Sequence, residues 1–146
     1  MISSELLRRY RFFWCMDDAQ LKAVAMISQE ATVAEGETIC VENEPADHLY
    51  FLMEGSVELS VTPGERRLIV GDVAPGEPFG LCALLLDQTH TYTAQAKKPS
   101  RVITMDASEL RNLCLSDCSL GMCLIRLEVI DGSQTGYVYV DEFGVV

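Results

Sequence analysis

Short β-prone runs separated by turn residues fill the middle of the chain, from residue 32 to residue 105. The predicted strands are 38–41, 49–53, 56–61, 67–70, 92–96 and 101–105. Turn residues recur between them about every 8–12 residues, and Val57, Leu59 and Val61 alternate with polar neighbours. This alternation is typical of antiparallel strands with one buried face, whereas a parallel sheet would need a helix between strands. The region therefore predicts an antiparallel β-barrel or double-stranded β-helix jelly roll.

Helical patterns precede this β region and interrupt it once. Residues 3–13 carry apolar side chains at helical spacing, and Asp17 and Asp18 supply N-cap chemistry for a second short helix. Residues 79–86 follow a Pro-Gly-Glu-Pro turn and predict a short helix that Gly80 opens. The expected fold is therefore α+β and mainly β, with N-terminal helices, a short helix inside the barrel and a C-terminal helix.

The C-terminal helix is expected to begin at Asp106, which forms a capping-box pattern with Glu109. It is expected to reach Ile130 with a break near residues 116–119. Residues 132–146 alternate as a strand would, and such a strand must join a sheet edge, pair with another chain or stay disordered. We expect one domain over residues 1–131 and a C-terminal tail over 132–146.

Composition limits the classes of partner. With 146 residues the chain is long enough for one domain, and a net charge of −11 disfavours nucleic acid because a phosphate backbone would be repelled. No apolar run approaches the roughly 18 residues that span a bilayer, and the N-terminus lacks a signal-peptide layout. We therefore expect a soluble cytoplasmic protein that binds no nucleic acid and has no membrane span.

Cysteine and histidine spacing argues against a metal site and against catalysis. The six cysteines form no CxxC pair and the two histidines lie far apart, so we expect no metal and largely buried free thiols in a reducing compartment. A cupin-type enzyme would need paired histidines, and a serine hydrolase would need Gly-x-Ser-x-Gly. The chain also lacks a P-loop and a GxGxxG motif. These absences predict a protein that is not an enzyme and has no cofactor.

The order of these elements resembles the cyclic nucleotide-binding domain, the sensor domain of proteins of the catabolite activator type. Five motifs carry the resemblance beyond the outline: Gly36-Glu37-Thr38-Ile39, Glu42-Asn43-Glu44-Pro45-Ala46-Asp47, Leu49-Tyr50-Phe51-Leu52, Glu54-Gly55-Ser56-Val57 and Gly76-Glu77-Pro78-Phe79-Gly80. Asn43 stands where the family usually has glycine, and asparagine also tolerates the left-handed backbone of such a turn. The last motif matches the approach to the family's phosphate-binding cassette.

The resemblance implies a ligand site, but the cassette departs from the family pattern. The family's cassette glutamate binds the ribose hydroxyl and its arginine binds the cyclic phosphate. Leu81 and His90 occupy the matching positions, while Ala83-Leu84 keeps the family's Ala-Leu pair. The candidate ligand-binding residues are Phe79, Gly80, Leu81, Cys82, Ala83, His90 and Thr91. Cyclic AMP or cyclic GMP is the implied ligand, bound weakly or not at all.

Other groups could replace part of the lost contacts. The backbone N–H groups of residues 81–83 are expected to point into the pocket, as anion sites at helix starts do. His90 either adds charge when protonated or serves as a buried residue bonded to backbone. Two basic pairs in neighbouring turns, Arg66-Arg67 and Lys97-Lys98, are the remaining candidates.

The C-terminal helix predicts a dimer. Leu120, Cys123, Leu127 and Ile130 form one apolar stripe, and Met122, Ile125 and Val129 form a second. A helix with two apolar stripes needs two partners, so we expect homodimerisation through Leu120–Ile130; the alternative is a helix that folds back across its own barrel. Two functions remain open: a regulatory module that senses a small ligand with altered affinity, and a ligand-free interaction or dimerisation scaffold.

Overall fold

The structure is a computed structural model and describes residues 1–85 and 88–131. Its elements, in chain order, are α1 (Ser4–Arg8), the 3₁₀ helix η1 (Arg11–Phe13), α2 (Asp18–Met26), β1 (Ser28–Val33), β2 (Thr38–Cys40), β3 (His48–Glu54), β4 (Val57–Val61), β5 (Leu68–Val73), β6 (Pro78–Phe79), the 3₁₀ helix η2 (Leu81–Leu84), β7 (Thr93–Ala96), β8 (Ser100–Asp106), α3 (Ala107–Ser116) and α4 (Cys118–Asp131). Among the described residues, no helix is long and apolar enough to cross a membrane.

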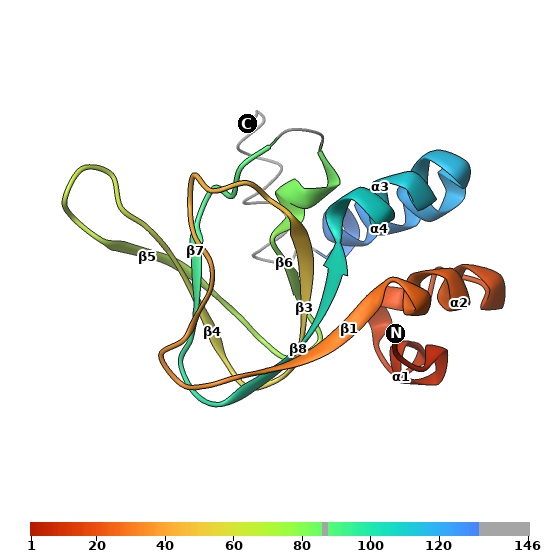
Figure 1. Cartoon of the computed structure of the whole chain (residues 1–146), viewed down its shortest axis with the longest axis horizontal. Coiled ribbons are helices and arrows are strands. Elements are labelled where there is room, and N and C mark those ends of the chain that lie inside the picture. Colours follow the sequence, from red (N-terminus) through yellow and green to blue (C-terminus); the bar gives the residue numbers. More distant parts are fainter. Residues whose placement is uncertain (86–87, 132–146) are drawn as a thin grey trace.

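The strands form two antiparallel sheets of four strands. One sheet has the order β1-β8-β3-β6 and the other has the order β2-β7-β4-β5. In Figure 1 the helices gather at one end of the sheets, and the β4–β5 hairpin extends from the opposite end. The expected mainly β jelly-roll fold with flanking helices is confirmed, and within the described residues it is built from these two sheets rather than a single closed barrel.

Two apolar clusters hold the fold together. The first lies between the helices and the first sheet, where the Phe13 and Phe51 rings pack with centroids 5.0 Å apart. The second lies between the sheets and includes Val57, Phe79 and Val102. The short helix η2 contributes to the first cluster, so the predicted cassette connects the helical end to the strands.

Local sequence signals set the helix boundaries. Asp17 caps α2 as expected: its carboxylate accepts from the Gln20 N–H at 2.8 Å, and the Gln20 side chain accepts from the Asp17 N–H at 2.9 Å. Asp106 likewise caps α3 by accepting from the Glu109 N–H at 2.9 Å. The expected break in the C-terminal helix is confirmed, because Asp117 is extended between α3 and α4.

Several expected elements differ in the structure. The expected helix 3–13 is two short pieces, because Tyr10 is extended between α1 and η1. Two strands, β1 and β6, were not predicted. The expected helix 79–86 is instead the strand β6 followed by η2, which forms only one turn of 3₁₀ helix. The extra strand expected within 132–146 lies outside the described residues.

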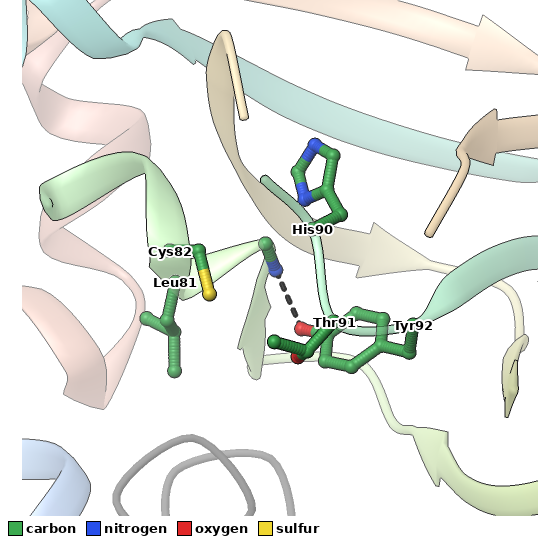
Figure 2. A pocket seen from close by; sticks show the side chains of 6 residues that line it. Leu81, Cys82, His90, Thr91 and Tyr92 are labelled. Carbon is green, nitrogen blue, oxygen red and sulfur yellow. Dashed lines mark hydrogen bonds between the residues drawn. The ribbon is translucent and has the colours of Figure 1, made fainter. Parts of the chain in front are cut away.

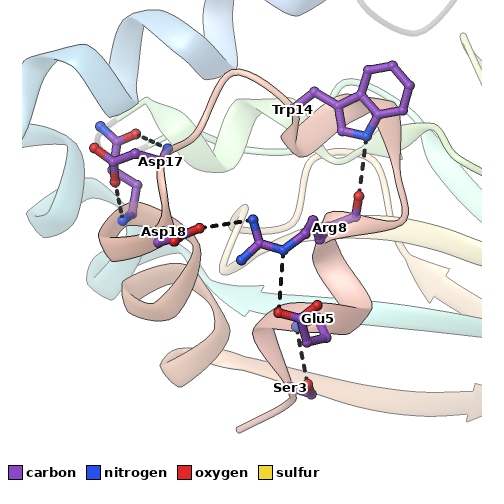
Figure 3. A network of polar contacts seen from close by, with 7 residues as sticks. Ser3, Glu5, Arg8, Trp14, Asp17 and Asp18 are labelled. Atoms are coloured by element: carbon purple, nitrogen blue, oxygen red, sulfur yellow. Dashed lines mark hydrogen bonds and ion pairs between the residues drawn. The ribbon is translucent and has the colours of Figure 1, made fainter.

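A polar network fixes the N-terminal segment (Figure 3). The Arg8 guanidinium binds Glu5 at 3.4 Å and Asp18 at 2.9 Å, and the Trp14 indole N–H donates to the Arg8 carbonyl at 3.2 Å. These contacts tie α1, η1 and the start of α2 together. Cys15 is thereby held at the turn between η1 and α2.

The expectation of six free thiols is wrong for two of the cysteines. A disulfide joins Cys15 to Cys123 of α4, with Cα atoms 5.8 Å apart. The sequence pattern did not predict this pairing, because the two residues are 108 positions apart and belong to no spacing motif. Cys40 and Cys82 are buried thiols as expected, Cys114 is half-buried and Cys118 is exposed.

The described part of α4 packs against its own chain. Leu120, Cys123 and Leu124 are buried in the cluster beneath the helices, whereas Met122 is 61% exposed. Leu120 and Cys123 belong to the first expected stripe and Met122 to the second, whereas the buried Leu124 was assigned to neither. The side chains from Ile125 onward lie outside the described residues, so homodimerisation through Leu120–Ile130 stays a prediction.

Candidate functional site

The short strand β6 leads into the cassette, and its last residue, Phe79, stacks on an aromatic ring before the chain turns at Gly80. Phe79 ends β6, pairs with Tyr50 of β3 and stacks on its ring, with centroids 5.1 Å apart and planes 16° apart. Gly80 follows with φ +76°. A Cβ atom at Gly80 would lie 2.9 Å from the Tyr50 ring and 3.2 Å from the His48 carbonyl oxygen. Glycine is therefore required both by the left-handed backbone and by the close packing.

Two backbone donors of the cassette are already used within the protein. The Gly80 N–H donates to the Tyr92 hydroxyl at 2.7 Å, the contact drawn in Figure 2. The Ala83 N–H donates to the Gly80 carbonyl at 3.1 Å, which closes the turn of η2. The expectation that the Ala83 N–H points at a ligand is therefore wrong in this conformation, because the i→i+3 bonding of the 3₁₀ turn uses that N–H for the Gly80 carbonyl.

The side chains of η2 belong to the core. Leu81 is 2% exposed, and Cys82 and Ala83 are also buried; all three pack in the cluster beneath the helices. An apolar residue suits this position, because a carboxylate there would lose its hydration without a compensating charge. Leu81 therefore fills space in the core beneath the helices.

His90 is buried beside the same turn, with 4% of its surface exposed. The backbone N–H of His90 donates to the Glu44 carbonyl at 2.9 Å, and the backbone carbonyl of His90 accepts from the Asn43 N–H at 2.8 Å. Burial lowers the pKa of His90 below its usual value, and the nearby carboxylates of Asp47 and Glu44 oppose this shift. The imidazole is therefore mostly uncharged at neutral pH.

The candidate residues meet around one small hollow. Gly80, Leu81, Cys82, His90 and Thr91 line it together with Tyr92, as Figure 2 shows. It is too small to admit a water molecule, whereas ligand pockets typically enclose about 300–1,000 Å³. The structure thus brings five of the seven predicted residues around one place, and the other two, Phe79 and Ala83, are buried next to them in the chain.

Two of the four basic residues from neighbouring turns, Arg67 and Lys97, bind a carboxylate outside the cassette. Glu58 of β4 is buried, and it binds the guanidinium of Arg67 and the ammonium of Lys97, the latter at 3.4 Å. The Arg67 hydrogen bond is the main cause that lowers the pKa of Glu58. Neither Arg66 nor Lys98 lines the hollow. None of the four expected substitutes is thus placed to replace the missing arginine.

The family of the chain follows from comparison with known proteins. The family model for the cyclic nucleotide-binding domain matches residues 30–117, which include every strand from β2 to β8 and the whole cassette. The chain belongs to the cyclic nucleotide-binding domain family. The resemblance stated from the sequence is therefore confirmed.

Several relatives share this domain. A solved structure of a proposed cyclic nucleotide-binding protein from Geobacter metallireducens is 40% identical, with a TM-score of 0.78, and the match covers 86% of this chain and 92% of that one. A CRP-like cAMP-activated global transcriptional regulator of Mycobacterium tuberculosis is 26% identical over 84% of this chain and 55% of its own length. A cyclic nucleotide-gated potassium channel of Mesorhizobium japonicum is 28% identical over 77% of this chain and 30% of its own length. The chain thus spans about a third to a half of these two curated relatives.

One residue of this cyclic nucleotide-binding domain was missed by sequence reasoning. Arg111 of α3 donates from its guanidinium to the Ala83 carbonyl at 2.8 Å. It is a cation bound directly to the cassette backbone, and it comes from the helix that follows the last strand. The helical periodicity of the sequence places Arg111 on the same face of α3 as Ala107, one turn away. The packing of α3 on η2 shows that its guanidinium contacts the Ala83 carbonyl.

Proposed function

We propose that the chain is a non-catalytic regulatory module that senses a small ligand at its cassette, with weakened affinity for cyclic AMP and cyclic GMP. The observation that carries this proposal is the pairing of Leu81 and an uncharged, buried His90 at the two ligand-contacting positions. The left-handed turn at Gly80 is retained, so the backbone frame of the site persists without its charged side chains. The proposal places the module in the cytoplasm and requires neither cofactor nor nucleic acid.

The expected loss of affinity is large. Removing the charged partner of a buried, hydrogen-bonded anion costs roughly 2–5 kcal/mol. The lost contact to the ribose hydroxyl costs roughly a further 1.5–3 kcal/mol. Since each 1.4 kcal/mol is about a factor of ten, a ligand that binds at micromolar concentration would need about millimolar concentration or more. The filled hollow adds to this cost, because its side chains must move before a ligand enters.

The filled hollow also supports a second function, an interaction scaffold that retains only the fold. Such a module would act through a surface, and the exposed apolar side chains of Met122 on α4 and Leu115 on α3 lie near its helical end. A homodimer through Leu120–Ile130 is the form we propose for this alternative. It requires no ligand at the cassette.

Calorimetric titration with cyclic AMP, cyclic GMP and cyclic dinucleotides at pH 6 and pH 7.5 tests both proposals. We expect dissociation constants weaker than about 100 μM for the unaltered protein. Binding tighter than about 10 μM would overturn the claim of weakened affinity. Stronger binding at pH 6 than at pH 7.5 would assign His90 as the group that meets the phosphate.

Restoring the family's side chains separates the two functions. We expect the double substitution Leu81→Glu with His90→Arg to tighten cyclic AMP binding at least about tenfold. His48→Arg, which adds the same charge on the neighbouring strand β3, is the matched control and should leave binding unchanged. Because Leu81 is buried, each variant must first show a cooperative thermal transition, and His90→Arg alone serves if the double variant does not. No gain in a folded variant favours the scaffold.

A further inference from the structure

The disulfide lies at the junction of the N-terminal helices and α4. Cys15 lies two residues after the end of η1 and is half-buried, whereas Cys123 is buried in α4. Their Cα separation of 5.8 Å lies within the range that a disulfide spans without backbone movement. The bond therefore joins two helical regions from opposite ends of the described chain.

The same two regions are also joined by contacts that do not depend on the bond. The Gln20 side-chain amide donates to the Asp117 carboxylate at 2.9 Å and to the Ser119 hydroxyl at 2.7 Å. Phe13 and Leu120 share the apolar cluster beneath the helices. These contacts keep the N-terminal helices on α4 when the sulfurs are reduced, so both redox states are expected to fold.

The remaining cysteines are free thiols, and they differ from the Cys15–Cys123 pair in bonding and reactivity. Burial raises the pKa of the Cys40 thiol to about 12, and burial also raises the pKa of Cys114. Raised values leave little thiolate, so these thiols react slowly. Cys118 stays an exposed free thiol. In reducing compartments disulfides are rare, and those that form are mostly transient and catalytic or redox-sensing.

We propose that Cys15 and Cys123 form a reversible redox site whose co-substrate is a small disulfide such as oxidised glutathione. The half-buried Cys15 thiolate attacks one sulfur of the small disulfide and releases the other as a thiolate. Cys123 then attacks the Cys15 sulfur of this mixed disulfide and releases the second small thiolate. In total, two protein thiols and one small disulfide give one protein disulfide and two small thiols, and excess small thiol reverses both steps.

The site controls how firmly α4 is held. In the oxidised state a covalent bond fixes α4 to the turn between η1 and α2, which the Arg8 network in turn fixes to α1 (Figure 3). In the reduced state the Gln20 hydrogen bonds and apolar packing are the contacts that, among the described residues, still hold the two regions together. Local opening of α4 is therefore more frequent in the reduced state. This regulation requires no nucleotide, so it goes beyond the proposed ligand sensing.

Equilibration of the purified chain in glutathione buffers of graded redox ratio tests the proposal. Alkylation followed by intact mass measurement should count four reactive cysteines after oxidation and six after reduction under unfolding conditions. Peptide mapping should place the bond between Cys15 and Cys123. Amide hydrogen exchange over residues 118–131 should be about tenfold faster in the reduced protein.

Single substitutions supply the controls. Cys118→Ser should give three reactive cysteines after oxidation and five after reduction, the same difference of two, because the exposed thiol takes no part in the bond. Cys15→Ser and Cys123→Ser should each abolish it and exchange at the rate of the reduced protein in both buffers. Six alkylated cysteines after oxidation, a bond that resists millimolar reduced glutathione, or equal exchange in the two states would each overturn the proposal.

Discussion

Arg111 of α3 donates a hydrogen bond to the carbonyl of Ala83, so the helix that follows the last strand is bound directly to the turn that forms the candidate site. Ala83 itself is buried in the cluster that also receives the N-terminal helices and α4. A ligand that moves the Ala83 carbonyl must therefore either break this hydrogen bond or move the Arg111 side chain with it. The bond is thus a direct contact between the cassette and the helices.

Removing the Arg111 guanidinium should destabilise the protein. Arg111→Leu retains apolar volume but leaves the Ala83 carbonyl without its side-chain donor, and we expect a loss of about 1.5–3 kcal/mol in the free energy of unfolding. Urea unfolding followed by circular dichroism measures it. Arg9→Leu, at an exposed position between α1 and η1, is the control and should change stability by less than about 0.5 kcal/mol. Equal effects at the two positions would contradict the role assigned to the hydrogen bond.

Gly80 should tolerate no side chain. The left-handed backbone costs an L-residue about 1–2 kcal/mol, and overpacking against the Tyr50 ring and the His48 carbonyl costs about 1–3 kcal/mol more. Gly64→Ala is a matched control, because its φ is +72° and nothing lies within 4 Å of its Cβ position. Chemical unfolding should therefore show a larger loss for Gly80→Ala than for Gly64→Ala. A loss of equal size would mean that backbone strain alone explains the glycine.

The sequence carried enough local information for most of the β architecture. Runs such as 49–53 and 101–105 are rich in β-prone apolar residues and lie within β3 and β8. β1 was missed because its sequence is Ser-Gln-Glu-Ala-Thr-Val, in which polar residues cover the exposed face and only the ends are buried. β6 was missed because it has two residues and begins with Pro78, which usually argues against a strand. Both are strands only because β8 and β3 pair with them.

The candidate site was predictable in position but not in its internal bonding. The order of the motifs predicts that Leu81 and His90 lie in one cassette, and the structure brings both to the same hollow. The hydrogen bond from Gly80 to Tyr92 depends on how β7 approaches the cassette, which no local pattern encodes. The Cys15–Cys123 bond and the Arg111 contact likewise join segments that are distant in the chain.

Neutralising Glu58 should weaken the β4–β5 hairpin at neutral pH. Its folded pKa is lowered, chiefly by the Arg67 hydrogen bond, so its contribution to stability is present above its ordinary pKa and is lost as pH falls through the folded value. Arg67 and Lys97 are half-exposed, so Glu58→Gln should cost only about 0.2–1 kcal/mol at pH 7. Thermal unfolding between pH 3 and pH 7 should show the difference vanishing in acid. Glu65→Gln, at an exposed turn position, is the control.

His90 should make the domain less stable as pH falls through the range of an ordinary histidine. Its folded pKa lies below its unfolded value of about 6.5, so above that value both states are neutral, and below it the unfolded state binds the additional proton. The free energy of unfolding should therefore decrease from pH 7.5 to pH 5.5. His90→Gln should flatten this slope, because glutamine does not titrate.

Parallel measurement of His48→Gln distinguishes the buried histidine from general acid effects. His48 is half-buried on β3, and its charge acts on His90 less than burial or the Asp47 and Glu44 carboxylates do. The His48→Gln variant should therefore retain most of the wild-type slope. Chemical unfolding at pH 5.5, 6.5 and 7.5 gives the three slopes. If His90→Gln and the wild-type protein lose the same stability over this range, carboxylates elsewhere carry the pH dependence and the neutral, buried state assigned to His90 is wrong.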